Sequence, residues 1–584
     1  MLVESFLETS AGRWPDKTAL VCGSRRWTFA QLETMANRLA HGLLAEGVRR
    51  GDRVAVYLDH GVEAVVSIFA IMKAAGVLLV VNPTTKPEKL CATLNHSRAA
   101  ALITSARKAA ALGEIWDHMP HLRSVIVDGE TALHSSRHRA PCSHGRSAVR
   151  PGAPTTPAPC PVPATITLAA LMARHAGDVR PPAKRAIDVD LAALIYTSGS
   201  TGDPKGVMLT HLNMVSAATS ITAYLENTPD DVILSVLPLS FGYGLYQVLM
   251  GAKTGGTVVL ERSFAYPQAI VRKLIDERVT GFPLVPTMAA ILLQMDLAKY
   301  DWSHLRYVTT AAAAMPTEHL LQFQRALPHV RIYLMYGQTE CTRVTYLAPE
   351  ELQRRPASVG RGMPNEEVWI ADEEGRRVGP GVVGELIVRG ANVMRGYWEM
   401  PEETARRLRP GPLPGESVLT TGDLFRADDE GYLYFVGRKD DIIKSRGEKV
   451  SPLEVENVLC RHPDIAEAAV IGVPDAVLGQ AVRAVVSLKS GSRLTEREML
   501  RHCAERLEDF MVPKSVEVRD SLPRTSNGKI DKRELLRSAL LTTEQSPPNA
   551  SRGCGPAAPP PLDAVEGLFG TLANQGSMFY GATT

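Results

Sequence analysis

The strongest chemical signal in the sequence is a loop rich in Gly, Ser and Thr that ends in a lysine. It reads Tyr196-Thr-Ser-Gly-Ser-Thr-Gly-Asp-Pro-Lys-Gly206 and contains the end of the apolar run 191–196. Glycines let a phosphate approach the backbone, N–H groups and hydroxyls can donate to its oxygens, and Lys205 adds positive charge. The loop lacks the Walker A spacing. We therefore expect a polyphosphate site that differs from those of P-loop kinases and GTPases.

Four further motifs follow this loop along the chain. They are Tyr336-Gly-Gln-Thr-Glu340, Thr421-Gly-Asp423, Gly437-Arg-Lys-Asp-Asp-Ile-Ile-Lys-Ser-Arg-Gly447 and Pro523-Arg-Thr-Ser-Asn-Gly-Lys529. In this order the five motifs resemble the motif set of the AMP-forming adenylate superfamily, and the resemblance covers roughly residues 5 to 540. That superfamily comprises acyl-CoA and aryl-CoA synthetases, adenylation domains of peptide synthetases, and beetle luciferases. The resemblance is greatest to an acyl-CoA ligase.

The resemblance implies a reaction in which a carboxylate attacks the α-phosphorus of ATP and pyrophosphate leaves. Because both reactants are anionic, the enzyme must neutralise charge at that phosphate and hold the groups in line. Lys529 resembles the family's catalytic lysine, Glu340 its carboxylate for Mg²⁺, and Thr339 a donor to the α-phosphate. A local interpretation of the same pair is a helix start, with Thr as cap and Glu near the helix dipole.

The resemblance also implies which residues bind the nucleotide. Asp423 resembles an aspartate that accepts both ribose hydroxyls, and Arg438 an arginine that contacts the same sugar. A carboxylate suits a diol because it accepts two hydrogen bonds at once. The full set of expected ATP-binding residues is Thr197, Ser198, Gly199, Ser200, Thr201, Gly202, Lys205, Ala312, Ala313, Tyr336, Gly337, Asp423 and Arg438.

A second half-reaction, transfer of the acyl group to a thiol, is implied by the same resemblance. Asp440 resembles a hinge about which the C-terminal domain rotates after adenylation. The rotation would remove Lys529 and bring Lys444 and Gly447 toward the adenylate, with Gly447 lining the tunnel for the pantetheine arm. The thiol acceptor is CoA or, as the alternative, the phosphopantetheine of an acyl or peptidyl carrier protein.

The segment 237–244 resembles the lining of the family's acyl pocket. Amino-acid-activating relatives usually carry Asp after the Phe, whereas Gly242 follows Phe241 here, and a buried ammonium without a partner is costly. We therefore expect an acid without an α-amino group, such as a fatty, aryl or polyketide-type acid. Arg343 contacts a polar group of the substrate, caps a neighbouring helix, or pairs with a structural carboxylate. The expected pocket residues are Phe241, Gly242, Tyr243, Tyr246, Met335 and Val344.

The motifs lie on elements whose pattern predicts a mainly α/β protein. Short apolar runs between about 190 and 340 alternate with helix-like stretches, which is typical of a parallel sheet with crossover helices. After about 365, Gly-punctuated short strands predict a small β-rich subdomain, in the form of a β-barrel. Beyond about 438, Ser451 and Thr495 open two helices of a small α+β unit.

We accordingly expect a large N-terminal domain over 1–437 with parallel α/β sheets and a small β-barrel subdomain. A small, mobile C-terminal domain over 438–541 follows, with the hinge at 440. The Pro- and Ala-rich stretches 132–164 and 542–584 are predicted to be a flexible insert and a disordered tail.

Composition narrows the class of protein. Lys and Arg (65) nearly balance Asp and Glu (63), which gives none of the basic excess typical of nucleic-acid binding. No apolar run is long enough to span a bilayer, the N-terminus lacks a secretory pattern, and the eight cysteines form no C-x-x-C pair. We expect a cytoplasmic ligase. The alternatives are a freestanding adenylation enzyme that loads a carrier protein, a catalytically silent nucleotide-binding protein, and a luciferase-like monooxygenase.

Overall fold

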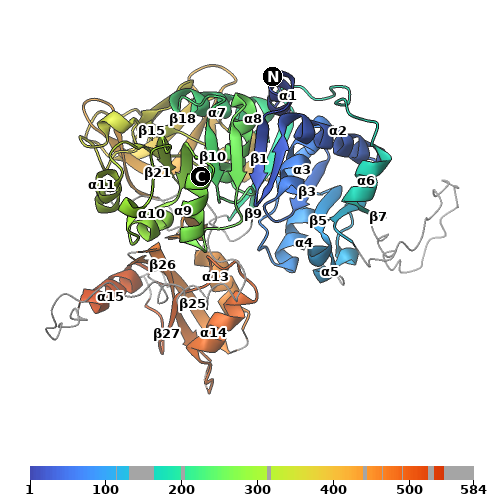
Figure 1. Cartoon of the computed structure of the whole chain (residues 1–584). Coiled ribbons are helices and arrows are strands. Elements are labelled where there is room, and N and C mark those ends of the chain that lie inside the picture. The colour runs from blue at the N-terminus through green and yellow to red at the C-terminus, as the bar shows by residue number, and fades with distance from the viewer. Residues whose placement is uncertain are drawn as a thin grey trace, which may run out of the picture.

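The structure is a computed structural model. It describes residues 1–112, 115–130, 164–198, 204–311, 317–438, 443–450, 452–462, 464–475, 477–489, 491–523, 530 and 532–544. Three sheets are built from residues up to 438 and form a large N-terminal domain, and a fourth belongs to a small C-terminal domain below it (Figure 1). The predicted insert 132–164 and tail 542–584 lie almost wholly outside the described residues, so those two predictions stay untested.

The first sheet has the strand order β16-β15-β14-β13-β12-β10-β11-β1-β2. Its central strands, from β14 to β1, run parallel, and antiparallel strands close both edges. The parallel strands are almost fully buried, as expected for strands covered on both faces. The strands are β1 (Thr18–Cys22), β2 (Arg25–Thr28), β10 (Val232–Ser235), β11 (Thr257–Leu260), β12 (Gly281–Leu284), β13 (Tyr307–Thr310), β14 (Arg331–Tyr336), β15 (Thr345–Leu347) and β16 (Arg361–Gly362).

The second sheet has the order β19-β9-β8-β4-β3-β5-β6-β7 and is also parallel except at one edge, where β9 pairs antiparallel with both β8 and β19. The strands are β3 (Arg53–Tyr57), β4 (Val77–Val80), β5 (Ala101–Ser105), β6 (Ser124–Asp128), β7 (Ala164–Thr167), β8 (Leu191–Ser198), β9 (Pro204–Thr210) and β19 (Gly396–Tyr397).

Helices α7 and α8 connect these two sheets. Helix α7 packs on β8 and β9, α8 packs on β10 and β11, and the two helices contact each other. Every residue of α8 from Gly242 to Ala252 is buried, as expected for a helix that is covered all round. Gly244 is required at its first turn because a Cβ there would lie 2.2 Å from the carbonyl oxygen of Pro238.

The helices of the large domain begin and end as follows. They are α1 (Ser5–Arg13), α2 (Phe29–Ala45), α3 (Val62–Lys73), α4 (Pro87–His96), α5 (Ala106–Ala111), α6 (Leu168–Arg174), α7 (His211–Tyr224), α8 (Gly242–Thr254), α9 (Pro267–Asp276), α10 (Pro286–Leu292), α11 (Thr317–Ala326) and α12 (Pro401–Arg407), with short 3₁₀ turns at Trp116–His118, Leu297–Lys299 and Pro349–Glu351.

The β-rich subdomain forms a five-stranded antiparallel sheet in which β21 pairs with β18, β20 and β22. Its strands are β17 (Glu366–Ala371), β18 (Gly384–Gly390), β20 (Leu408–Pro410), β21 (Ser417–Ala427) and β22 (Leu433–Arg438). The pairing of β21 with β22 places Asp423 directly opposite Arg438 in the backbone register.

The small domain packs helices on both faces of a second five-stranded sheet. Thr495 opens a helix, as predicted, and forms a capping box with Glu498; Met499, Cys503 and Leu507 are buried. Its elements are β23 (Ile443–Ser445), β24 (Glu448–Val450), α13 (Pro452–Cys460), β25 (Ile465–Asp475), β26 (Gly479–Leu488), α14 (Glu496–Ala504), β27 (Ser515–Val518) and α15 (Lys532–Glu544).

One local expectation is wrong. Thr339 and Glu340 do not start a helix, because residues 339–341 form a turn between β14 and β15. No helix in the described part of the chain has both the length and the apolar character needed to cross a bilayer.

Candidate active site

A buried carboxylate marks one end of the candidate site. Asp423 is 1% exposed, and its Oδ2 accepts hydrogen bonds of 2.7 Å from the Tyr336 hydroxyl and of 2.7 Å from the Gln338 side-chain amide. The amide of Gln338 also donates to the Thr421 carbonyl at 2.8 Å. These bonds fix the carboxylate where β14 and β21 meet, so that it can accept hydroxyl donors. Sequence reasoning missed the part played by Gln338, because its partner lies 85 residues away.

The backbone after Tyr336 turns back on itself tightly. A Cβ at Gly337 would lie 2.6 Å from the Thr342 carbonyl oxygen and 2.8 Å from the Arg343 Cα, so glycine is needed there. The turn buries Thr339, which is 3% exposed, and leaves Glu340 half-buried.

The Gly/Ser/Thr loop connects β8 and β9, which form an antiparallel hairpin. Thr197 faces Lys205 and Ser198 faces Pro204 in the register. The structure therefore places both ends of the predicted phosphate loop. Several predicted site residues lie outside the described residues, namely Gly199, Ser200, Thr201, Gly202, Ala312, Ala313, Asp440 and Lys529.

Four side chains connect this hairpin to the turn after β14. Lys205 Nζ lies 2.7 Å from Glu403 Oε2 and 5.5 Å from the ring centroid of Tyr397. The Tyr397 hydroxyl donates to Glu340 Oε1 at 2.7 Å. The hydrogen bond from Lys205 lowers the pKa of Glu403, and burial raises the pKa of Tyr397, which stays a neutral donor. Tyr397 and Glu403 had no recognisable signal in the sequence.

This cluster suits a magnesium nucleotide. Glu340 carries a carboxylate, the kind of ligand that Mg²⁺ prefers, and both Glu340 and Lys205 lie next to Tyr397. Among the described residues no group of three or more His, Cys, Asp and Glu side chains could hold a metal by itself. The residues therefore fit an ion held by one carboxylate together with phosphate oxygens of the nucleotide.

The predicted acyl-pocket residues Phe241, Gly242, Tyr243 and Tyr246 lie at the N-terminal end of α8, whereas Met335 lies on β14 and Val344 directly precedes β15. Tyr243 and Tyr246 are fully buried, Phe241 is 9% exposed, and Met335 and Val344 are buried. The Tyr243 hydroxyl donates to the Thr309 carbonyl at 2.9 Å. Phe241, at the N-terminal end of the helix, is the member of this set closest to solvent.

The small domain faces the large domain with the hairpin of β23 and β24. Arg446 and Gly447 form its turn with φ of 57° and 76°, the left-handed pair typical of a type I′ turn. Gly447 is buried, and a Cβ there would lie 3.3 Å from Val285 of the large domain. Lys444 Nζ lies 4.5 Å from the ring centroid of Phe435. The predicted Gly447 face is therefore the face docked on the large domain.

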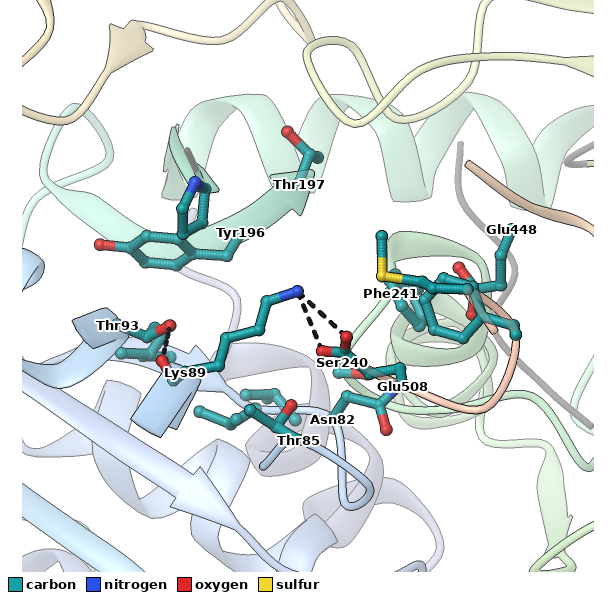
Figure 2. Close-up of a pocket in the computed structure, with 16 residues that line it drawn as sticks. Asn82, Thr85, Lys89, Thr93, Tyr196, Thr197, Ser240, Phe241, Glu448 and Glu508 are labelled. Atoms are coloured by element: carbon teal, nitrogen blue, oxygen red, sulfur yellow. Dashed lines mark hydrogen bonds and ion pairs between the residues drawn. The ribbon is translucent and has the colours of Figure 1, made fainter. Parts of the chain in front are cut away.

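A pocket lies at this domain junction (Figure 2). Tyr196, Thr197 and Phe241 line it from the large domain, and Glu448 and Glu508 from the small domain. Lys89 reaches across the pocket, and its Nζ lies 3.0 Å from Glu508 Oε1 (Figure 2). Burial raises the pKa of Glu448 well above its usual range. The pocket lies between the β8–β9 hairpin, the N-terminal end of α8 and the β23–β24 hairpin.

Comparison with known proteins identifies the family. The chain matches the family model of the AMP-binding enzymes over residues 7–398 and that of the AMP-binding enzyme C-terminal domain over residues 454–529. It is 32% identical over 556 residues to a long-chain-fatty-acid–CoA ligase of Bacillus subtilis (strain 168), covering 91% of this chain and 94% of the relative.

Two further relatives agree with this match. A methyl-dioxo-octahydro-indenyl propanoyl:CoA ligase of Rhodococcus jostii (strain RHA1) is 34% identical over 542 residues, covering 91% of this chain and 97% of that protein. A double mutant of o-succinylbenzoate CoA synthetase from Bacillus subtilis superimposes with a TM-score of 0.75 at 27% identity, covering 91% and 97% of the two chains. The chain therefore belongs to the AMP-binding enzyme family and is an AMP-forming acid–thiol ligase of the acyl-CoA synthetase type, which uses ATP and CoA.

Proposed function

We propose that the two half-reactions of this ligase take place in two arrangements of its domains and that the arrangement described here is the one for thiol transfer. The observation that carries this proposal is the docking of Gly447 against Val285, beside the pocket that contains Phe241 and Thr197. In this arrangement a pantetheine arm would enter at the domain junction and pass Gly447 to reach the acyl-adenylate. Because glycine has no side chain, Gly447 would leave room for the arm.

For adenylation we propose that Lys529 approaches the α-phosphate and the attacking carboxylate after the small domain rotates about Asp440. Helix α15, which begins three residues later, packs on β25 and lies at the left of the small domain in Figure 1. A rotation of the whole domain would therefore carry Lys529 with it. Its positive charge would stabilise the negative charge that develops in the transition state.

The large domain would hold the nucleotide in both arrangements. Asp423 would accept the ribose hydroxyls, with Arg438 on the neighbouring strand, and Thr339 would donate to the α-phosphate. Lys205 would leave Glu403 to bind the β- and γ-phosphates of ATP, because a lysine amine is a mobile donor on a flexible stem. When bound at Glu340, Mg²⁺ would neutralise phosphate charge.

The acid would lack an α-amino group. The first turn of α8, which begins at Gly242, carries no acidic residue to pair with an ammonium. We propose a cytoplasmic location because no disulfide joins any of the five described cysteines, as is usual in a reducing compartment.

A screen of acid-dependent exchange of labelled pyrophosphate into ATP tests the adenylation half. An acid that supports exchange is then incubated with ATP, Mg²⁺ and either CoA or a phosphopantetheinylated carrier protein, and thioesters are detected by mass spectrometry. We expect acid-dependent exchange and acyl-CoA. If a thioester formed only on the carrier protein, the carrier and not CoA would be the acceptor. If none of the screened acids supported exchange, the result would favour a catalytically silent protein.

A further inference from the structure

Arg343 is a fully buried cation in the candidate acyl pocket. The residue is 1% exposed, and the Nε and Nη1 atoms of its guanidinium have no hydrogen-bond partner. A guanidinium stays protonated in proteins, and burying a charge without a counter-charge is costly. Arg343 takes part in no ion pair with any carboxylate of the described residues. The structural carboxylate considered from the sequence is therefore missing.

The neighbours of Arg343 are neutral. Its guanidinium lies 4.8 Å from the ring centroid of Tyr243 and is hydrogen-bonded to the side chain of Tyr224. Burial raises the pKa values of Tyr224, Tyr243 and Tyr246, although Arg343 opposes the rise in each, so these phenols stay protonated at neutral pH. Tyrosine faces attract a cation only weakly compared with an anion.

The tyrosine hydroxyls are also engaged with other groups. Tyr224 donates to the Met335 sulfur at 3.0 Å, and Tyr243 donates to the Thr309 carbonyl at 2.9 Å. Tyr246 receives a longer hydrogen bond of 3.4 Å from Thr342. The protein therefore supplies dipoles around the guanidinium and leaves two of its donor nitrogens unused.

Arg343 lies close to the proposed site of adenylation along the chain. It follows Glu340 by three residues, which limits the distance between their Cα atoms to about 11 Å. The backbone between them is not extended, because the Arg343 amide donates a hydrogen bond of 2.7 Å to the Cys341 carbonyl, so the two Cα atoms lie closer than this limit. An acid whose carboxylate reacts beside Thr339 and Glu340 could reach Arg343 with a short spacer.

We propose that Arg343 binds a second carboxylate on the substrate, so that this ligase activates a compact dicarboxylic acid. This inference rests on the proposed acyl site. The second carboxylate would receive the unused Nε–H and Nη1–H as a paired, charge-assisted interaction, for which the planar guanidinium is suited. The buried charge would then be neutralised by the substrate, and an acid with only an apolar tail would leave it unpaired.

Matched acids test this inference in the pyrophosphate exchange assay. Each diacid from succinate to adipate, and isophthalate, is compared with its monoamide and with the monoacid that lacks the second group. We expect at least one diacid to exceed both partners in kcat/KM by about 30-fold or more, as for a buried charge pair with one member removed. Preference for monoacids in every pair, or equal use of diacid and monoamide, would overturn the proposal.

Variants assign the preference to the residue. Arg343→Met should abolish the preference for the diacid while exchange with the monoacid is kept or increased, and Arg343→Lys should retain part of the preference. Arg331→Met is the matched control, because Arg331 lies on the same strand-turn segment, 5.7 Å from the Tyr333 ring, and pairs with Glu226 outside the pocket. It should leave the ratio unchanged.

The variants also separate this inference from the proposed function. An unchanged diacid preference in Arg343→Met would refute the role of Arg343. If that variant fails to fold, a wild-type ratio in Arg343→Lys together with equal thermal stabilisation of the wild-type enzyme by diacid and monoacid in the presence of AMP would refute it equally. Exchange with monoacids but with no diacid would support the proposed ligase function and refute the dicarboxylic substrate. If no acid supported exchange, the result would instead contradict the proposed function.

Discussion

Substitution of Gly447 by leucine should slow thiol transfer and spare adenylation. Gly447 forms the turn of the β23–β24 hairpin with a φ of 76° and is buried against the large domain. A Cβ at this position would lie 3.3 Å from both Cβ and Cγ1 of Val285, closer than ordinary van der Waals contact. A leucine side chain would add further carbons in the same space.

The substitution has two energetic effects, and only one depends on the domain arrangement. The left-handed backbone costs an L-residue about 1–2 kcal/mol, and it does so in every arrangement because the turn belongs to the small domain. Overpacking against Val285 costs about 1–3 kcal/mol and exists only while the hairpin is docked. This second cost should lower the rate of thiol transfer by about 5- to 160-fold.

The assay supplies preformed acyl-adenylate and CoA and follows acyl-CoA, while pyrophosphate exchange reports adenylation separately. Gly491→Leu is the matched control, because Gly491 has a φ of 87° in the same domain and a Cβ there would meet nothing within 4 Å. Both variants should lose thermal stability, but only Gly447→Leu should lose thiol transfer. Equal transfer rates in the two variants, or equal loss of both half-reactions in Gly447→Leu, would refute this reasoning.

Two further predictions concern charge. Lys529→Ala should reduce pyrophosphate exchange by on the order of 100-fold, as for the loss of a directed charge on the transition state, while acyl-CoA still forms from supplied adenylate. A loss of both activities would contradict it. Burial lowers the pKa of His211 to about 4, below the value of about 6.5 in an unfolded chain, so the unfolded state binds the proton more readily. The free energy of unfolding should therefore fall as the pH drops from about 6.5 to 4, and denaturant titrations of His211→Asn should show a shallower fall than the wild type; parallel curves would exclude this contribution.

The sequence predicted the elements that depend on local patterns. The helix start at Thr495, the strand before the Gly/Ser/Thr loop and the alternation of apolar runs all depend on residues close in the chain, so they can be recognised in a single sequence. The register that places Asp423 opposite Arg438 was not predicted, because strand pairing depends on the whole sheet.

The missed site residues have distant partners. Lys205 pairs with Glu403, 198 residues away, and Tyr397 donates to Glu340 across 57 residues. Arg343 is a different case, because its chemistry depends on what is missing around it. From the sequence its partner could be a substrate group, the end of a neighbouring helix or a structural carboxylate, and only the packing around the side chain distinguishes these three.

The most direct test of the two-arrangement account locks the domains as they are described here. Lys89 and Glu508 form an ion pair of 3.0 Å across the junction, so the variant Lys89→Cys/Glu508→Cys can be bridged with a short bis-methanethiosulfonate reagent that dithiothreitol removes. The two single variants, treated with the same reagent, control for the native cysteines. We predict that the bridged enzyme converts supplied acyl-adenylate to acyl-CoA but loses pyrophosphate exchange, and that reduction restores exchange. Undiminished exchange in the bridged enzyme would contradict the account.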